Sequence, residues 1–369
     1  MNPSKNLHQR RYDIDSLRVV AIFLLIFYHL TVVFQPWGSL IPGFFQNEIS
    51  LDWIWFFSGL MNVWRIPILF VISGMGVAFS MRKRNLKELL SERCLRILLP
   101  LFFGIFIIVP LQFEFLFLQK EAHQFFSSYS PNPSHLWFLA NIFIYVLFCS
   151  PIFFYLKKKP DSWIGKTLKF LTSSYLGLAV LVGIFCLESE ILVGSWRFGR
   201  VSFESYAGTD HGFFMGLLCF LSGFAFIFFG DFFWKTVEYL KKITLFLAFI
   251  LYFLRLSNEF VNPPWAMAIE SWMWMFAIFG YFFSYRNKKN KIFIYLSPAA
   301  YPFYITHMLF MNISCFFLIP MNINPLYKFL LILSLTFFGC FFSYEFLIRR
   351  VSFLRPLFGL KTQKKTNTN

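Results

Sequence analysis

The most constraining feature of this chain is a succession of ten long apolar segments separated by short polar ones. A helix that crosses a bilayer needs about 20 mostly apolar residues. Segments of that kind occur at 14–34, 53–80, 95–117, 136–156, 172–192, 212–233, 243–260, 264–285, 292–316 and 326–348. Because lipid offers no hydrogen bonds to the backbone, each segment is expected to be helical. The sequence therefore predicts an all-α integral membrane protein with about ten transmembrane helices.

Composition supports this fold class and excludes others. Hydrophobic residues make up 57% of the 369 residues and charged residues only 14%, whereas a soluble domain has about 25% charged residues. This deficit argues against a soluble enzyme or a disordered chain. The formal net charge is +16, but the basic residues form short clusters between apolar runs. That distribution is typical of membrane topology, so the bilayer and not nucleic acid is the expected partner.

The basic clusters also predict the orientation. If the N-terminus is cytoplasmic, 28 of the 34 Lys and Arg residues fall on the inner side, as the positive-inside rule requires. Both termini are then cytoplasmic. The chain divides into an N-terminal segment (1–13), a membrane domain (14–350) and a basic tail (351–369), and the residues after Leu360 are expected to be disordered. Within the second segment, Arg65 and Pro67 follow a Trp-rich stretch, which predicts a short interfacial helix followed by a broken span.

Several kinds of site are not expected. The six cysteines form no CxxC pair and no metal-ligand spacing, so neither a disulfide nor a metal site is predicted. The apolar stretch from Val19 to Phe34 lacks a small-residue cleavage site and is interpreted as a retained first span. No P-loop, dinucleotide-binding or GxSxG motif occurs.

The first span carries the sharpest functional signal. Charged groups within a span are costly and usually functional. Arg18 and His29 are eleven residues apart, which places them on one helix face about 16 Å apart along the axis. Asp15 lies one turn before Arg18, within reach of an ion pair. The alternative interpretations are an Arg18 that anchors the helix at lipid headgroups and a His29 that is a structural core histidine.

Further polar residues fall at a similar depth in other spans. His307, Glu114, Glu270 and Arg65 are all expected in the outer half of the membrane, where they would converge with His29 on a cavity. The alternative is that the charged groups only neutralise one another. His135 and Trp137 lie at the outer start of the fourth span, where a Trp is also a usual interfacial anchor.

These residues occur in motifs that resemble the membrane acyltransferase family 3. The first-span motif is Asp15-Ser16-Leu17-Arg18 followed by Tyr28-His29, and the second is the R-x-P-x-x-F-x-x-S-G pattern from Arg65 to Gly74. They are followed by the Arg-rich loop from Glu92 to Pro100, by His135-Leu136-Trp137-Phe138-Leu139, and by Tyr301-Pro302-Phe303-Tyr304 with His307. The resemblance covers residues 11–350, is weakest between 157 and 285, and looks nearest to the branch that modifies periplasmic glucans.

The resemblance implies an O-acyltransferase of the inner (cytoplasmic) membrane. Such an enzyme moves an acyl group, acetyl or succinyl, from cytoplasmic acyl-coenzyme A to a hydroxyl of an extracytoplasmic glycan, with no permanently bound cofactor. His29 would be the general base, with Arg18 as its catalytic partner. Arg93 and Arg96 would bind the phosphates of coenzyme A, whereas Arg65, His135, Trp137, Glu270, Tyr304 and His307 would contact donor or acceptor. Among these, His307, Tyr304 and Trp137 are candidate oxyanion donors.

Two points stay open from the sequence. Direct transfer and a transient acyl-His29 are both compatible with the motifs. A transporter or flippase for a glycan or a lipid-linked sugar would also use ten helices around a polar cavity, although it needs no coenzyme A site. A sensor or scaffold is less consistent with so many buried ionisable groups.

Overall fold

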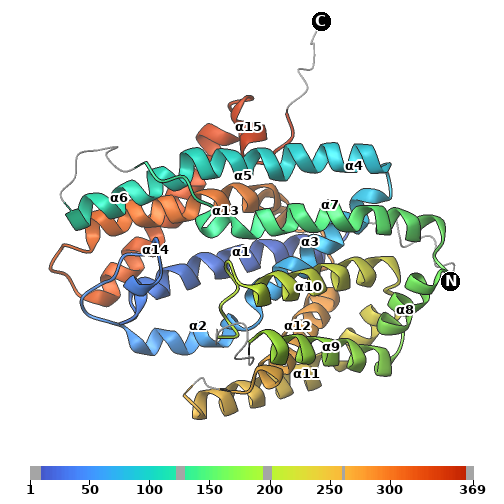
Figure 1. Cartoon of the computed structure of the whole chain (residues 1–369). Helices are drawn as coiled ribbons and strands as arrows, with labels where there is room; N and C mark the ends of the chain where they lie inside the picture. The colour runs from blue at the N-terminus through green and yellow to red at the C-terminus, as the bar shows by residue number, and fades with distance from the viewer. Residues whose placement is uncertain (1–9, 122–128, 194–201, 260–261, 363–369) are drawn as a thin grey trace, which may run out of the picture.

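The computed structural model describes residues 10–121, 129–193, 202–259 and 262–362. Within these ranges the chain is helical and contains no strand (Figure 1). The expected disordered tail after Leu360 lies largely outside the described residues. The α-helices are α1 (Tyr12–Val33), α2 (Trp55–Asn62), α3 (Arg65–Met81), α4 (Leu86–Arg93), α5 (Leu99–Phe103), α6 (Val109–Glu121), α7 (Trp137–Lys158), α8 (Trp163–Thr172), α9 (Tyr175–Leu192), α10 (Asp210–Phe228), α11 (Asp231–Ser257), α12 (Pro264–Arg286), α13 (Lys291–Leu318), α14 (Pro325–Phe342) and α15 (Leu354–Leu357).

In the described part of the chain, nine helical segments are long and apolar enough to cross a membrane. They coincide with nine of the ten expected segments, so the protein is a multi-pass membrane protein. The remaining segment, 243–260, lies inside α11, a single helix that also carries Lys235, Lys241 and Lys242. A tenth crossing and the orientation of the termini stay predictions. The predicted end of the sixth segment, 212–233, is wrong: α10 ends at Phe228 and α11 begins at Asp231.

The expected break in the second segment is confirmed. The short helix α2 ends at Asn62, and α3 begins at Arg65 after a turn in which the Trp64 indole donates to the Leu60 carbonyl (2.9 Å). Pro67 lies in the first turn of α3, where its missing N–H leaves no hydrogen bond unmade. Because of this turn, Arg65 is the first residue of α3 and does not lie in the middle of a continuous helix.

Two glycines allow α3 and α10 to pack closely. A Cβ atom on Gly74 would overlap the Phe220 carbonyl, and one on Gly223 would overlap the Val71 carbonyl. The pairing of 74 with 220 and of 71 with 223 shows that the two helices are antiparallel. Small residues at such crossings let backbones approach in membranes, and Gly74 and Gly223 have this role here.

The elements from α4 to α6 form one continuous helical segment, Leu86–Glu121. It contains two π-helical turns, η4 (Cys94–Leu98) and η5 (Gly104–Ile108). Each precedes a proline, Pro100 or Pro110, which lacks the N–H that an ordinary helical turn would use. The Phe106 carbonyl, four residues before Pro110, instead accepts a hydrogen bond from the Tyr129 hydroxyl (2.9 Å). The proline at the second π-helical turn therefore leaves the Phe106 carbonyl hydrogen-bonded.

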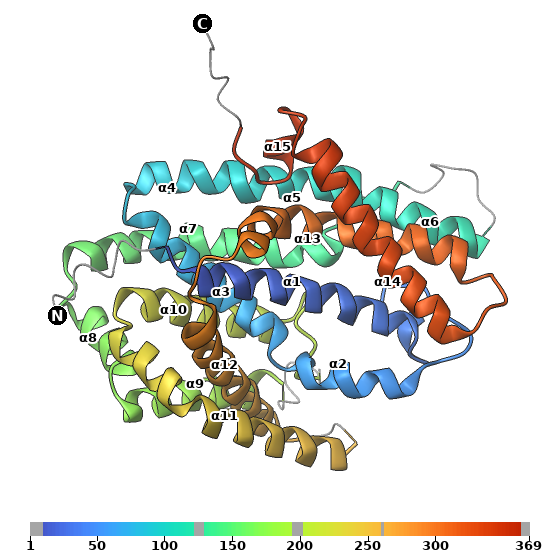
Figure 2. The ribbon, with the colours of Figure 1, turned by 180° about the vertical axis from the view of Figure 1, so that it is seen from behind.

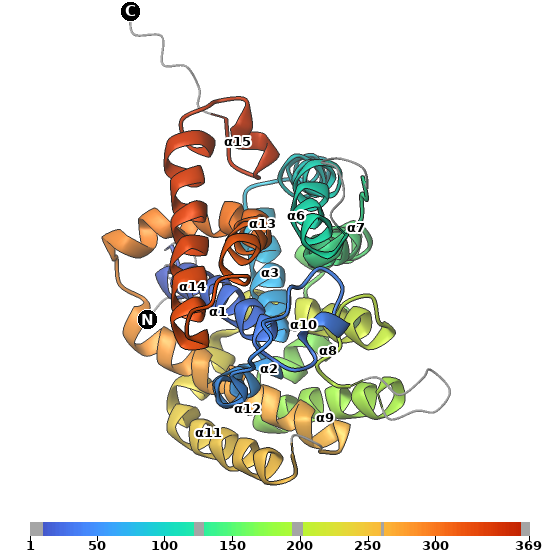
Figure 3. The same cartoon turned by 90° about the vertical axis from the view of Figure 1, so that its left-hand side faces the viewer.

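The helices α1 and α13 form the centre of the molecule. Phe23 stacks on Phe303 and His29 stacks on His307, so the two helices run in the same direction. Seen end-on, α1 lies between α13 on one side and α10 and α12 on the other (Figure 3), and the view from behind shows α14 crossing the bundle beside α13 (Figure 2). Of the residues at this contact, Phe303 and His307 on α13 are buried, and Phe23 and His29 on α1 are half-buried.

The segment between α1 and α2 folds back over the end of α1. The N–H groups of Asn47 and Leu51 donate to the Val33 and Phe34 carbonyls, at 2.9 and 2.8 Å. The buried Lys328 ammonium ties this segment to the end of α13, because it donates to Asn47 Oδ1 (3.2 Å) and to the Ile319 carbonyl (2.7 Å). The 35–51 segment is thus a fixed cover over the His29 end of the central helices.

Candidate active site

Two histidines meet at the centre of the bundle. His29 Nδ1 lies 2.8 Å from His307 Nε2, and the two rings are nearly parallel, 7° apart. The other ring nitrogen of His307, Nδ1, is 2.7 Å from the Tyr304 carbonyl one turn earlier on α13. His307 is fully buried, whereas His29 is half-buried. The two imidazoles, which the sequence placed at a similar depth, are thus joined by a direct hydrogen bond.

The hydrogen bonds determine where the protons lie. A carbonyl only accepts, so His307 Nδ1 carries the proton that it donates to Tyr304. In a neutral His307, Nε2 then has a lone pair and accepts from His29 Nδ1–H. His29 Nε2 is left unprotonated, and it has no hydrogen-bond partner among the described residues. The pair therefore holds His29 in the tautomer that a general base needs, with its orientation set by a second group.

The third histidine packs against this pair. The ring of His135 is 5.0 Å from that of His307, edge to face, and His135 Nε2 donates to the Ile305 carbonyl (3.3 Å). The Tyr304 hydroxyl donates to the His135 carbonyl (2.5 Å). The start of α7 is thus bonded to α13 from both directions, and the structure brings together four of the predicted site residues: His29, His135, Tyr304 and His307.

Arg65 approaches the same site from α3. Its guanidinium carbon lies 3.2 Å from the centre of the Tyr28 ring, next to His29, and its Nη2 donates to Asn62 Oδ1 (3.3 Å). Arg65 is buried, and its Nε has no hydrogen-bond partner among the residues that the structure describes. A guanidinium stacked on an aromatic ring keeps its in-plane N–H groups available for a ligand.

Glu270 lies in a different arrangement from the one expected. It forms a buried bidentate ion pair with Arg255 of α11, with Nε–Oε2 and Nη2–Oε1 distances of 2.7 and 2.9 Å. Arg255 Nη2 also donates to the Gly59 carbonyl (2.7 Å), and Glu204 Oε1 lies 3.8 Å from Arg255 Nη1. A buried charge requires such a partner. Glu270 is thus neutralised by a neighbouring charge, which was the alternative interpretation of the charged groups. Within the described residues it has no contact with the histidines.

A cluster of arginines surrounds one carboxylate at the other end of the bundle. The capping box of Asn85 and Glu88 starts α4 in a defined position, and the next turns carry Glu92, Arg93 and Arg96. Glu92 Oε1 is 3.0 Å from Arg96 Nη1, and Glu92 Oε2 is 3.8 Å from Arg93 Nε. Arg84 also contacts Glu92, at 3.3 Å. Three guanidinium groups around one carboxylate leave an excess of positive charge.

Two further groups complete this basic cluster. Arg18 of α1 forms the expected ion pair with Asp15, at 3.7 Å, and is an electrostatic neighbour of Arg93 and Arg96. Within the described residues, the buried Tyr301 hydroxyl on α13 has no hydrogen-bond partner, and Arg93 Nε makes no hydrogen bond and only the 3.8 Å ion contact with Glu92. An N–H group and a hydroxyl that make no hydrogen bond, beside excess positive charge, are suited to phosphate or another anion.

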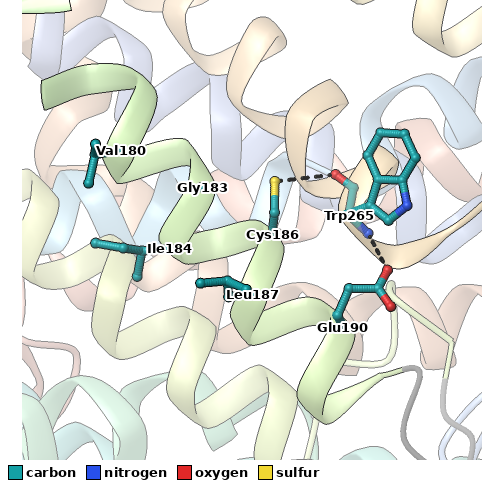
Figure 4. A pocket seen from close by; sticks show the side chains of 7 residues that line it. All are labelled: Val180, Gly183, Ile184, Cys186, Leu187, Glu190 and Trp265. Carbon is teal, nitrogen blue, oxygen red and sulfur yellow. Dashed lines mark hydrogen bonds between the residues drawn. The ribbon is translucent and has the colours of Figure 1, made fainter. Parts of the chain in front are cut away.

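For the last predicted residue, Trp137, the described residues show no hydrogen bond or ring contact with the histidine pair. It packs on Phe70 with ring centres 6.1 Å apart and is half-buried. A surface groove between α9 and α12 shares no residue with either cluster (Figure 4). It is lined by Val180, Gly183, Ile184, Cys186, Leu187, Glu190 and Trp265.

Sequence reasoning missed several buried polar residues that the structure brings forward. Arg255 lies inside the expected segment 243–260 but has no predicted role, and Tyr301 has one only as part of a motif. Gln112 and Asn312 are fully buried polar residues within the third and ninth expected spans. The signal that would have found all of them is the one used for His29, a polar side chain inside an apolar segment.

Comparison with protein families gives one match, a model of an acyltransferase domain that covers residues 11–345. Comparison with curated proteins and with solved structures finds no similar chain. The matched range contains the histidine pair, Arg65 and the whole arginine cluster.

Proposed function

Because this chain belongs to acyltransferase family 3, and is therefore an acyltransferase and not a transporter, we propose that it transfers an acyl group from cytoplasmic acyl-coenzyme A to a hydroxyl of an extracytoplasmic glycan. The transferred group is acetyl or succinyl, and the enzyme resides in the inner membrane. The observation that carries the proposal is the hydrogen bond between His29 and His307, which leaves His29 Nε2 as a free base.

The arginine cluster supports coenzyme A as the donor. Arg93, Arg96 and Arg18 would bind the phosphates on the cytoplasmic side, together with the Tyr301 hydroxyl. From Arg18 to His29 is about 16 Å along α1, a distance that the pantetheine arm of coenzyme A spans. The thioester would then lie beside the histidine pair while the nucleotide stays at the membrane surface.

In the reaction, His29 Nε2 removes the proton from the acceptor hydroxyl as its oxygen attacks the thioester carbonyl carbon. The new C–O bond gives a tetrahedral oxyanion, which collapses with cleavage of the C–S bond. The leaving thiolate takes the proton back from His29, so the products are an ester and free coenzyme A. No acyl-His29 intermediate is needed, because the base is free to act directly on the hydroxyl.

The geometry favours an oxyanion donor other than the expected His307, Tyr304 and Trp137. His307 and Tyr304 already donate to the Tyr304 and His135 carbonyls, and Trp137 packs on Phe70. Arg65 Nε is buried and unpartnered beside Tyr28 and His29. We assign oxyanion stabilisation to Arg65 on this basis.

The test is to express the wild-type chain, His29→Ala and Arg18→Ala in a host that lacks this protein, and to measure ester groups on its extracytoplasmic glycans by mass spectrometry. We expect esters with the wild type and none above background with His29→Ala. Arg10→Ala is the matched control for Arg18→Ala, because Arg10 contacts the same Asp15 but is exposed. Normal ester content in both His29→Ala and Arg18→Ala, at normal protein levels, would contradict the proposed mechanism.

A further inference from the structure

A cluster of polar side chains lies beyond the histidine pair. The Asn312 amide donates through Nδ2 to the carbonyls of Gln112 (3.1 Å) and Gly43 (3.3 Å). The Gln112 amide in turn donates to Ser134 Oγ (3.4 Å), the residue before His135. The cluster thus joins α6, α13, the start of α7 and the 35–51 segment. None of these contacts involves the ion pair of Glu270.

The order along α13 places this cluster on the far side of the base from the arginines. Tyr301, His307 and Asn312 follow one another at axial intervals of about 9 Å and about 7.5 Å. The 35–51 segment confirms the order from α1, because the Phe44 ring is 5.6 Å from that of His29 and Gly43 is its neighbour. A molecule that reaches His29 from the end opposite to the arginine cluster passes these amides.

Three buried polar atoms here have no hydrogen-bond partner in the part of the chain that the structure describes: Gln112 Oε1, Asn312 Oδ1 and His135 Nδ1. Gln112 and Asn312 are fully buried, and His135 is 9% exposed. Asn312 is fixed in its orientation, because both partners of its Nδ2 are carbonyls that only accept. His135 is fixed in the same way, since Nε2 donates to the Ile305 carbonyl and Nδ1 of the neutral ring keeps a lone pair.

All three atoms are therefore hydrogen-bond acceptors. Leaving a buried acceptor unpaired is costly, and such groups in native proteins call for an explanation. A ligand that satisfies them must bring hydrogen-bond donors without negative charge, because a carboxylate or phosphate would be repelled by three acceptor atoms. Adjacent hydroxyl groups on an uncharged sugar ring have this property.

We propose that Gln112, Asn312 and His135 form the acceptor subsite and bind non-reacting hydroxyls of a neutral sugar unit, while His29 takes the proton of the reacting hydroxyl. This inference rests on the proposed function and adds the chemical class of the acceptor. The groups of the arginine cluster that make no hydrogen bond are an N–H and a phenol beside positive charge, as an anion requires, and those of the amide cluster are acceptors only. The two ends of the site thus select ligands of opposite hydrogen-bonding character.

The experiment compares two substitutions of one residue, Gln112→Met and Gln112→Glu. Met has a similar shape and no strong hydrogen-bonding group, whereas Glu, neutral when it is buried, keeps a carbonyl oxygen toward the ligand and can donate its O–H to Ser134 Oγ in place of the Gln112 amide. Membranes that contain each variant receive acetyl- or succinyl-coenzyme A and increasing amounts of the neutral fraction of the host's extracytoplasmic glycan. We expect the acceptor KM to rise about tenfold for Gln112→Met and less than threefold for Gln112→Glu, with the donor KM unchanged in both.

A second measurement makes the result independent of folding. Thermal stabilisation of the purified full-length variants by the acyl-coenzyme A reports an intact donor site. Equal acceptor KM values for wild type and Gln112→Met, or equally large rises for Met and Glu, would overturn the inference while the proposed function stands. If Gln112→Met is not stabilised by the donor, Asn312→Ser takes its place, and an unchanged acceptor KM in that variant overturns the inference too. Absence of transfer by the wild type would instead refute the proposed function itself.

Discussion

Replacing His307 tests the central feature of the site, the orientation of His29. In His307→Phe, the His29 Nδ1–H loses the acceptor that lies 2.8 Å away. An unpaired buried donor costs about 1–3 kcal/mol, and 1.4 kcal/mol corresponds to a factor of ten. If this penalty falls on the reactive arrangement of His29, the rate of acyl transfer falls about 5- to 150-fold. Loss of the base itself, in His29→Ala, is expected to cost about 100- to 10,000-fold.

The conservative variant His307→Gln separates orientation from packing. A glutamine offers an oxygen that can accept from His29 Nδ1–H, so it should recover part of the activity that His307→Phe loses. The assay follows coenzyme A release with a thiol reagent, at varied acyl-coenzyme A and saturating glycan. We expect kcat to order as wild type, Gln, Phe, with the donor KM constant, because the arginine cluster is untouched.

The double variant gives the refuting result. Residues that act as one unit are not additive, so His29→Ala combined with His307→Phe should be no slower than His29→Ala alone. If the two losses multiply, or if His307→Phe retains wild-type kcat, then His307 does not orient the base and the assignment of protons to the pair is wrong.

Three further predictions concern other parts of the molecule. Glu270→Gln breaks the buried pair with Arg255 and is expected to lower the free energy of unfolding by about 3–5 kcal/mol, measured as a fall in the unfolding midpoint in detergent; an unchanged midpoint would argue against the pair. Gly74→Ala should destabilise by about 1–3 kcal/mol because its Cβ overlaps α10, whereas Gly76→Ala, which meets no atom within 4 Å, should not. Arg93→Ala should raise the donor KM without changing the acceptor KM, and an unaltered response to donor concentration would remove Arg93 from the coenzyme A site.

The helical spans were predictable because their signal is local. Length and apolarity suffice to locate a span, and even the break between α2 and α3 follows from Pro67 and the Trp-rich stretch before it. The exception is α11, in which Lys241 and Lys242 lie within one continuous helix of 27 residues. The sequence predicted a separate apolar segment at 243–260, because the charged residues before it resemble a polar loop. In the structure these charged residues belong to the same helix, so a change from charged to apolar residues did not mark a helix end.

The depth of a side chain was also predictable, but its partner was not. Counting residues from the start of each span placed His29 and His307 at one level, and they are hydrogen-bonded. The same counting placed Glu270 beside them, yet it pairs with Arg255 on the adjacent helix. Depth depends only on position along a span, whereas the partner depends on helix rotation and on which helices are neighbours. The strong packing of α11 against α12 decides the partner of Glu270, and no motif encodes it.

The positions of the unpaired atoms along α13 give the proposed reaction a direction. At Tyr301 and Arg93 the groups that make no hydrogen bond within the described residues are a phenol and an N–H beside excess positive charge. About 17 Å further along the axis, at Asn312, the group without a hydrogen bond is an acceptor. A phosphorylated donor would be attracted to the arginine cluster and repelled by the acceptor atoms of the amide cluster. An uncharged polyol would not be attracted to the arginine cluster in this way. Under the proposed function, each substrate would reach His29 from its own end, so that only the acyl group would have to pass the centre of the bundle. We propose that the enzyme can in this way modify a glycan on one side of the membrane with a thioester from the other, without transporting either molecule.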